Sequence, residues 1–125
     1  MPHRHSVLVV EDDPDTREGL VLLVHSRGVD AVGAANGLEA LKVLRGGLRP
    51  CLILLDLVMP EMDGIHFREA QLADSALAGI PVLVCSVAAP NLIADVTRLG
   101  IRGVTRKPPD WDDIVRAIDD TCIGA

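Results

Sequence analysis

The sequence predicts an α/β fold, an open and doubly wound parallel sheet of five strands with helices on both faces. Three apolar runs, residues 7–10, 52–55 and 82–84, are continuous rather than alternating, which is typical of strands covered on both sides. Segments with helical periodicity separate these runs, so strands and helices alternate along the chain. The chain has 125 residues, of which 49% are hydrophobic and 24% charged, and this composition fits one ordinary globular domain.

Each predicted helix begins behind residues that favour a helix start. The first three are residues 15–26 behind Asp13 and Pro14, residues 37–45 behind Asn36, and residue 64 to about residue 77 behind Asp63. Pro90 and Asn91 open a fourth helix that extends to about residue 99. The fifth begins at about residue 110, and its apolar residues fall on one face: Trp111, Ile114, Val115 and Ile118.

The two remaining strands, residues 30–34 and residues 103–105, have the small or mixed residues of sheet edges. Right-handed crossovers and short loops then favour the strand order 2-1-3-4-5. In such a sheet the functional groups follow the carboxyl ends of the strands. We expect one domain over residues 1–125, with a core from about residue 6 to residue 121 and no output domain.

Charge and composition exclude several function classes. The 18 acidic against 12 basic residues give a net charge of −6, which argues against direct nucleic-acid binding. Only Phe67 and Trp111 are aromatic, which disfavours base or flavin stacking. The chain has no apolar run of membrane-spanning length and no signal peptide, so we expect a cytoplasmic protein. Cys51, Cys85 and Cys122 lack metal-ligand spacing and are interpreted as reduced, mostly buried thiols.

Acidic residues follow the first and third strands. Glu11, Asp12 and Asp13 come directly after the first strand, and Asp56 follows the third. These strands are neighbours in the predicted order, about 4.8 Å apart, so the carboxylates should converge and repel one another. Either proton uptake or a cation would relieve this repulsion, and an oxygen-only, partly open site favours Mg²⁺. The alternative is that Asp12 or Asp13 simply caps the helix that begins at Pro14.

A hydroxyl group and an ammonium group follow the last two strands. Ser86 stands after the fourth strand and Lys107 after the fifth. A phosphoryl group would need such partners, because its oxygens accept hydrogen bonds and carry negative charge. Only Lys42 and Lys107 are lysines among the 12 basic residues, which favours a specific requirement at residue 107. The alternative is a solvated lysine in front of a proline.

Taken together, these residues resemble the response-regulator receiver domain of two-component signalling. The resemblance covers residue 7 to about residue 118 and rests on an acid pair, an aspartate, a hydroxyl residue and a lysine behind successive strands. Its specific parts are Val9-Val10-Glu11-Asp12-Asp13, Leu55-Asp56, Met59-Pro60, Met62-Asp63-Gly64, Ile80-Pro81-Val82, Ser86 and Lys107-Pro108. The resemblance implies a flavodoxin-like fold of five strand–helix units.

The resemblance assigns a role to each acidic residue. Asp56 is expected to be the phosphoacceptor, whose carboxylate attacks a phosphohistidine and becomes an acyl phosphate. Asp12 and Asp56 would bind Mg²⁺ directly, together with the backbone carbonyl of Val58, whereas Glu11 would act through bound water. The partner would be a sensor histidine kinase or a histidine phosphotransfer protein. The chain would not be an enzyme beyond Mg²⁺-dependent self-phosphorylation and autodephosphorylation.

The hydroxyl and ammonium groups would contact the phosphoryl group in such a domain. Lys107 would pair with one phosphoryl oxygen, and Ser86 would move to donate a hydrogen bond to another. The family usually holds the peptide bond between Lys107 and Pro108 in the cis form.

Three positions depart from the family pattern. Val104 stands where the family has a switch aromatic, three residues before Lys107, so the aromatic relay cannot operate. Val87 replaces a small residue after Ser86, and Pro109 replaces an aromatic. We therefore expect phosphorylation at Asp56 to couple differently to the surface between residues 91 and 105.

The favoured function is a phosphoacceptor receiver that signals through the face of its fourth helix, fifth strand and fifth helix, to a downstream protein effector or a homodimer. The alternative is a degenerate receiver that acts as a binding or dimerisation module without phosphate, which Val87 and Val104 motivate. An aspartyl-phosphate hydrolase is disfavoured because Val58 stands where its second acid is needed. Flavodoxin-type cofactor binding is disfavoured because the first loop is acidic.

Overall fold

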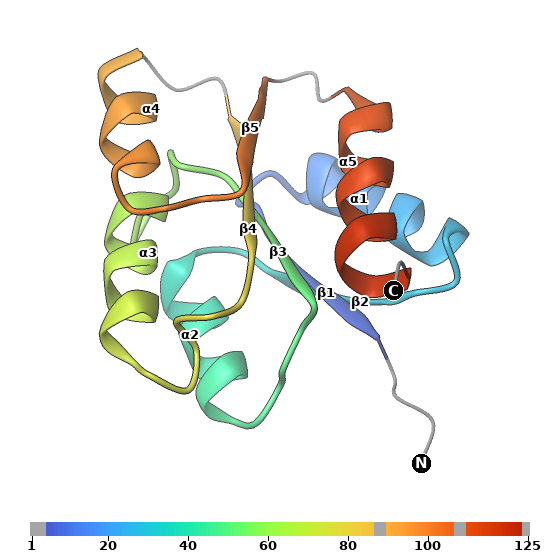
Figure 1. Ribbon diagram of the computed structural model, residues 1–125, viewed down its shortest axis with the longest axis horizontal. Coiled ribbons are helices and arrows are strands. Elements are labelled where there is room, and N and C mark those ends of the chain that lie inside the picture. The colour runs from blue at the N-terminus through green and yellow to red at the C-terminus, as the bar shows by residue number, and fades with distance from the viewer. Residues whose placement is uncertain (1–4, 87–89, 107–109, 124–125) are drawn as a thin grey trace.

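The computed structural model describes residues 5–86, 90–106 and 110–123, and for residue 106 it describes the backbone alone. At its centre is a five-stranded parallel sheet. The strands are β1 (Ser6–Val10), β2 (Asp30–Ala34), β3 (Leu52–Leu55), β4 (Val82–Ser86) and β5 (Gly103–Arg106). The helices are α1 (Pro14–Ser26), α2 (Gly37–Arg45), α3 (Gly64–Ala73), α4 (Pro90–Thr97) and α5 (Trp111–Ile118), followed by a π-helical segment, η1 (Asp119–Ile123) (Figure 1).

The strand order is β2-β1-β3-β4-β5, which confirms the predicted topology. The register pairs Val10 of β1 with Leu55 of β3, and Leu55 with Val84 of β4. These three strands therefore end level with one another at the carboxyl edge of the sheet. The residues of β1, β3 and β4 are all buried, whereas the edge strand β2 mixes buried and exposed residues, as its small and polar side chains predict.

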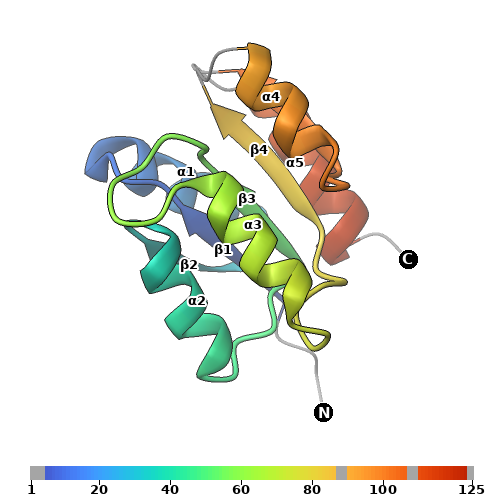
Figure 2. The same cartoon turned by 90° about the vertical axis from the view of Figure 1, so that its left-hand side faces the viewer.

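Helices cover both faces of the sheet, and each face has its own apolar cluster. α1 and α5 lie on one face, and α2, α3 and α4 lie on the other (Figures 1 and 2). Successive residues of β3 alternate between the clusters: Ile53 and Leu55 pack towards α2, α3 and α4, and Leu52 and Leu54 towards α1 and α5. This double burial is the reason that the strand sequence is a continuous apolar run.

The predicted helix starts are confirmed by their caps. The side chains of Asp13, Asn36, Asp63 and Asp110 accept hydrogen bonds from the backbone N–H groups of Thr16, Glu39, His66 and Asp112, respectively. Each bond satisfies a donor that the first turn of a helix leaves unpaired. Asp13 is therefore the capping residue in front of α1, and Asp12 is not.

Two helix ends differ from the prediction. α3 ends at Ala73 and not near residue 77, because Asp74 adopts an extended conformation and its side chain accepts a hydrogen bond from the Ala76 N–H. α5 continues into η1, which periodicity does not indicate. Within the predicted apolar face of α5, Ile114 and Ile118 are buried, but Trp111 is 48% exposed.

The prediction of three reduced thiols is wrong for two of them. Cys51, just before β3, and Cys122, in η1, form a disulfide with a Cα–Cα distance of 5.4 Å. The two residues are 71 positions apart, so no sequence spacing indicates the pairing. The fold brings them together because η1 returns the chain to the amino edge of the sheet. Cys85, in β4, is buried as predicted and lies outside this bond.

A buried arginine links α3 to the turn after α4. Arg68 is 5% exposed, and its guanidinium donates to the carbonyl oxygens of Leu99 and Gly100 at 3.3 and 3.0 Å and to Gln71 Oε1 at 2.7 Å. Gln71 Nε2 donates in turn to the carbonyl oxygens of Leu77 and Ile80. Burial lowers the pKa of the Arg68 guanidinium. This network holds the turn after α4 and the turn segment before β4 against α3.

Replacing Arg68 with Met should reduce the free energy of unfolding by about 3 kcal/mol, because the buried Gln71 and two backbone carbonyl groups lose their donor together. The control is Arg98→Met, since Arg98 is exposed and makes only a surface ion pair with Asp95; its loss should be at most about 0.5 kcal/mol. Urea unfolding of both variants measures the difference. Equal losses would mean that the buried network does not stabilise the fold.

Candidate functional site

Three carboxylates lie together at the carboxyl edge of the sheet. Glu11 and Asp12 follow β1 and Asp56 follows β3, and one oxygen from each lies within 4.8 Å of the other two. The backbone N–H of Asp56 donates to the carbonyl oxygen of Val10 at 3.0 Å, which fixes the two strand ends side by side. Glu11 and Asp56 are 2% and 5% exposed, whereas Asp12 is exposed. The predicted convergence of these acids is thus present in the structure.

The backbone around Glu11 is held from several sides. Its N–H donates to the carbonyl oxygen of Ala34 at the end of β2, and its own carbonyl oxygen accepts a bond from Arg17 at 2.8 Å. Its side-chain Oε2 accepts a bond from the N–H of Asp13 at 3.2 Å. The turn from β1 into α1 therefore directs the Glu11 carboxylate inward while Asp13 turns away to cap α1.

Ser86 contacts the predicted phosphoacceptor directly. Its hydroxyl group, at the end of β4, donates to Asp56 Oδ1 at 2.9 Å, and Ser86 is almost fully buried. The N–H of Val58 also points to Oδ1, at 3.3 Å. Val58 lies in the loop after Asp56 with its side chain exposed, so its backbone and not its side chain faces the site. The structure thus brings four of the predicted site residues and the Val58 backbone into one place.

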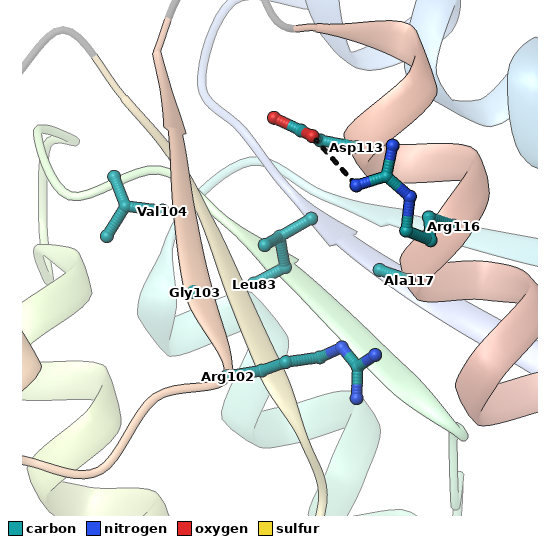
Figure 3. Close-up of a pocket in the computed structure, with 7 residues that line it drawn as sticks. All are labelled: Leu83, Arg102, Gly103, Val104, Asp113, Arg116 and Ala117. Carbon is teal, nitrogen blue, oxygen red and sulfur yellow. Dashed lines mark ion pairs between the residues drawn. The ribbon is translucent and has the colours of Figure 1, made fainter.

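Some predicted positions lie outside the described residues: Lys107, Val87, Pro109 and the bond between Lys107 and Pro108. Their predicted roles stay predictions. Val104, which stands at the family's aromatic position, is partly buried against the cluster of α2, α3 and α4. Its side chain lies on the side of β5 away from Arg116 and Ala117 of α5 (Figure 3).

A glycine that sequence analysis gave no role shapes the loop after Asp56. A Cβ added at Gly64 would collide with the carbonyl oxygen of Asp56 and come within 2.8 Å of Leu57 Cα. The Gly64 N–H donates to the Leu57 carbonyl oxygen at 3.0 Å, so the first residue of α3 packs directly on the loop that carries Asp56. The sequence signal for this role was the glycine at the start of the predicted helix behind Asp63. Only a residue without a side chain permits the backbone of the Asp56 loop to come so close.

An open cavity of about 240 Å³ lies between β5 and α5, away from the carboxylates (Figure 3). It is lined by Leu83, Arg102, Gly103, Val104, Asp113, Arg116 and Ala117. Its two arginines have acidic partners: Arg102 pairs with Asp120 at 2.6 Å and Arg116 with Asp113 at 3.7 Å. The cavity therefore offers little unbalanced positive charge to an anion, and the chemistry lies at the carboxylates.

Family comparison agrees with this geometry. The response regulator receiver domain family matches residues 7–119, and the chain belongs to this family. The transcriptional regulatory protein GlrR of Escherichia coli K12 is 36% identical over 124 residues, which cover 96% of this chain. The chain spans between 27% and 34% of the length of the curated relatives it matches.

Solved structures show the same fold. The crystal structure of a response regulator receiver protein from Pseudomonas putida has a TM-score of 0.90 and 31% identity, covering 96% of this chain and 99% of that chain. The phosphorylated cyanobacterial phytochrome response regulator RcpA has a TM-score of 0.82 and 25% identity, covering 94% of this chain and 93% of that chain.

Membership places the chain in two-component signalling. Receiver domains are signalling modules rather than enzymes in the ordinary sense, and their partners are histidine kinases or phosphotransfer proteins. They bind Mg²⁺ at an acidic pocket, and the cluster of Glu11, Asp12 and Asp56 could hold a metal ion. Over the described part of the chain, no helix combines the length and the apolar character that a membrane span requires.

Replacing Gly64 with Ala should displace the Asp56 loop, because the new methyl group meets backbone atoms that cannot rotate away. We expect a loss of about 2 kcal/mol in the free energy of unfolding and a slower rate of phosphoryl labelling at Asp56. Gly79→Ala is the matched control, since a Cβ there meets nothing within 4 Å. Chemical denaturation and labelling kinetics measure both effects. A Gly64 variant that behaves like the Gly79 variant would contradict the packing argument.

Proposed function

We propose that this receiver domain accepts a phosphoryl group on Asp56 from a phosphohistidine of a partner protein. The observation that carries the proposal is the hydrogen bond from Ser86 to Asp56 Oδ1, formed beside the carboxylates of Glu11 and Asp12. A binding module without phosphate chemistry would not need a buried hydroxyl group aligned on a buried aspartate between two further acids. The phosphorylated state of RcpA, a relative of 25% identity, supports the same conclusion.

In the proposed reaction a carboxylate oxygen of Asp56 attacks phosphorus. The new O–P bond makes an acyl phosphate, the N–P bond of the phosphohistidine breaks, and the released imidazole takes up a proton from solvent. Hydrolysis of the acyl phosphate later restores the carboxylate. Because Asp56 is held by the backbone of Val10 and Val58, its carboxylate is positioned before the partner arrives, which lowers the entropic cost of the transfer.

The donor set at the site suits Mg²⁺. All three converging side chains offer hard carboxylate oxygens, one from each within 4.8 Å of the others, and such oxygen ligands suit Mg²⁺. We infer that Asp12 and Asp56 bind the ion directly with the backbone carbonyl of Val58, and that Glu11 acts through water. When bound, Mg²⁺ offsets negative charge on the phosphoryl group during transfer.

Two further groups complete the proposed phosphoryl pocket. Ser86 donates to Asp56 in the unphosphorylated protein, and after transfer the same hydroxyl group would donate to a phosphoryl oxygen. Lys107 would pair with another phosphoryl oxygen, as the family pattern implies. The hydroxyl group thus has an acceptor in both states.

The remaining features of the proposal concern partners and output. We place the protein in the cytoplasm, with a sensor histidine kinase or a histidine phosphotransfer protein as phosphoryl donor. The output surface would be the face of α4, β5 and α5, where the indole of Trp111 and the cavity between β5 and α5 are open to a downstream protein or a second copy. We also propose that residues 1–125 form a single receiver domain.

Incubation with acetyl phosphate and Mg²⁺ should add one phosphoryl group to the wild-type protein, seen by intact-mass spectrometry. Asp56→Asn should carry none, because the amide is not a nucleophile, and chelation of Mg²⁺ should abolish labelling of the wild type. Ser86→Ala should label roughly tenfold more slowly, as expected for one lost hydrogen bond.

The control for this experiment is Asp95→Asn, which removes an exposed aspartate of α4 outside the carboxylate cluster. It should label like the wild type. Unchanged labelling of Asp56→Asn would overturn the assignment of the phosphoacceptor, and an absence of labelling in the wild type would favour the phosphate-independent module.

A beryllofluoride phosphoryl mimic should report the output surface. Because Val104 cannot make the aromatic movement of the family, we expect amide chemical-shift changes at β4 and in the turn before α4 but only small changes along β5. Asp56→Asn is the control and should show no response. Changes over β5 as large as those of a receiver with the aromatic residue would refute different coupling.

A further inference from the structure

The disulfide between Cys51 and Cys122 ties the last turn of the described chain to the sheet. Cys51 stands at the amino end of β3 and Cys122 in η1. Asp56 stands at the opposite end of β3, five residues further on, a separation of roughly 16 Å along an extended strand. The phosphoacceptor chemistry makes no use of this pair.

The surroundings of Cys51 suit both redox states. Its Sγ lies 3.0 Å from the carbonyl oxygen of Ser6, and a thiol can donate to that oxygen whereas a disulfide sulfur cannot. The backbone N–H of Cys51 donates to the same oxygen at 2.9 Å, so the residue stays in place whichever form its sulfur takes. Cys51 is partly exposed, and Cys122 is 2% exposed. Cys51 is therefore the sulfur that an external reagent reaches first.

The segment that carries Cys122 packs into the apolar cluster of α1 and α5 and also makes two ion pairs at the surface. Arg27, after α1, pairs with Asp119 at 2.8 Å, and Arg102, before β5, pairs with Asp120 at 2.6 Å. The side chains in both pairs are more than a third exposed, so solvent and salt weaken them. The covalent bond between Cys51 and Cys122, unlike these ion pairs, is not weakened by salt. Figure 1 shows the end of α5 reaching back towards the amino edge of the sheet.

We propose that Cys51 and Cys122 form a redox modification site, which a low-molecular-weight disulfide oxidises and thiols reduce. Formation of the disulfide fixes η1 and the end of α5 to the sheet. Disulfides in cytoplasmic proteins are mostly transient or redox-sensing rather than permanent. With the cytoplasmic location proposed above, this pair is therefore a reversible site. The proposal does not depend on phosphorylation of Asp56.

The exchange reaction balances in two steps. The thiolate of Cys51 attacks a disulfide of the glutathione type, which forms a mixed disulfide and releases one thiolate. The thiolate of Cys122 then attacks Cys51 Sγ, which forms the protein disulfide and releases the second thiolate. The protein loses two electrons and two protons, and the small disulfide gains them. Reduction by a thiol follows the same steps in reverse.

The consequence of closure falls on α5. Asp113, Arg116 and Ala117 of α5 form one wall of the cavity beside β5, one to three turns before Cys122. Fixing the end of this helix restricts the movement of that wall, and thus of the proposed output surface, without touching the carboxylates at the other edge of the sheet. Oxidation would thereby act on the surface that transmits the signal and not on phosphoryl uptake.

The test equilibrates the full chain in buffers with different ratios of reduced to oxidised glutathione, followed by thiol trapping and peptide mapping. We expect one intramolecular bond between Cys51 and Cys122 that forms and disappears reversibly across these buffers. Oxidation should raise the melting temperature by about 10 °C and slow amide hydrogen exchange of residues 114–123. The rate of acetyl phosphate labelling should stay unchanged.

Two variants keep the test specific. Cys85→Ala removes the third cysteine and should titrate like the wild type, whereas Cys122→Ser should form no intramolecular bond and show no redox-dependent hydrogen exchange. A bond that includes Cys85, a bond that no glutathione ratio opens or closes, or unchanged hydrogen exchange of residues 114–123 on oxidation would each overturn the proposal. Asp56→Asn should retain the redox response, which separates a failure here from a failure of the phosphoacceptor assignment.

Discussion

The parallel pairing of β1 with β3 is the constraint on which the site depends. It places Val10 opposite Leu55, so that the residues that follow, Glu11 and Asp56, emerge together at one edge of the sheet. The two acids are 45 positions apart along the chain, and the pairing of the two strands brings them side by side. The carboxylate oxygens that meet at this edge form a group that could hold a metal ion.

Several packing devices keep this edge in place. Gly64 lets α3 rest on the backbone of Asp56 and Leu57, and Asp13 caps α1 while Glu11 turns inward. On the same side of the sheet as α3, the buried Arg68 ties the turn after α4 to α3 through two backbone carbonyl groups. The same network ties α3 to the segment before β4, and Ser86 ties the end of β4 to Asp56.

β3 connects two chemically different ends of the molecule. Its carboxyl end leads to Asp56 and its amino end begins after Cys51, whose partner lies in the final turn. In the proposed function the first end would meet the phosphoryl donor, and in the proposed redox site the second would set how firmly α5 and η1 are held. A receiver built in this way can take a phosphoryl signal and a redox signal at opposite edges of one sheet, because a rigid strand separates them.

The sequence alone determined the five strands and five helices, the edge positions of the two weak strands, and the convergence of Glu11, Asp12, Asp56 and Ser86 behind the strands. These features follow from local signals, namely apolar runs, capping residues and polar groups at strand ends, combined with the chirality of crossovers. The tertiary structure alone decided the end of α3 at Ala73, the exposure of Trp111, the role of Gly64 and the pairing of Cys51 with Cys122. Each of these depends on which distant segment lies beside the residue, and the pairing joins positions 71 apart that no local pattern connects.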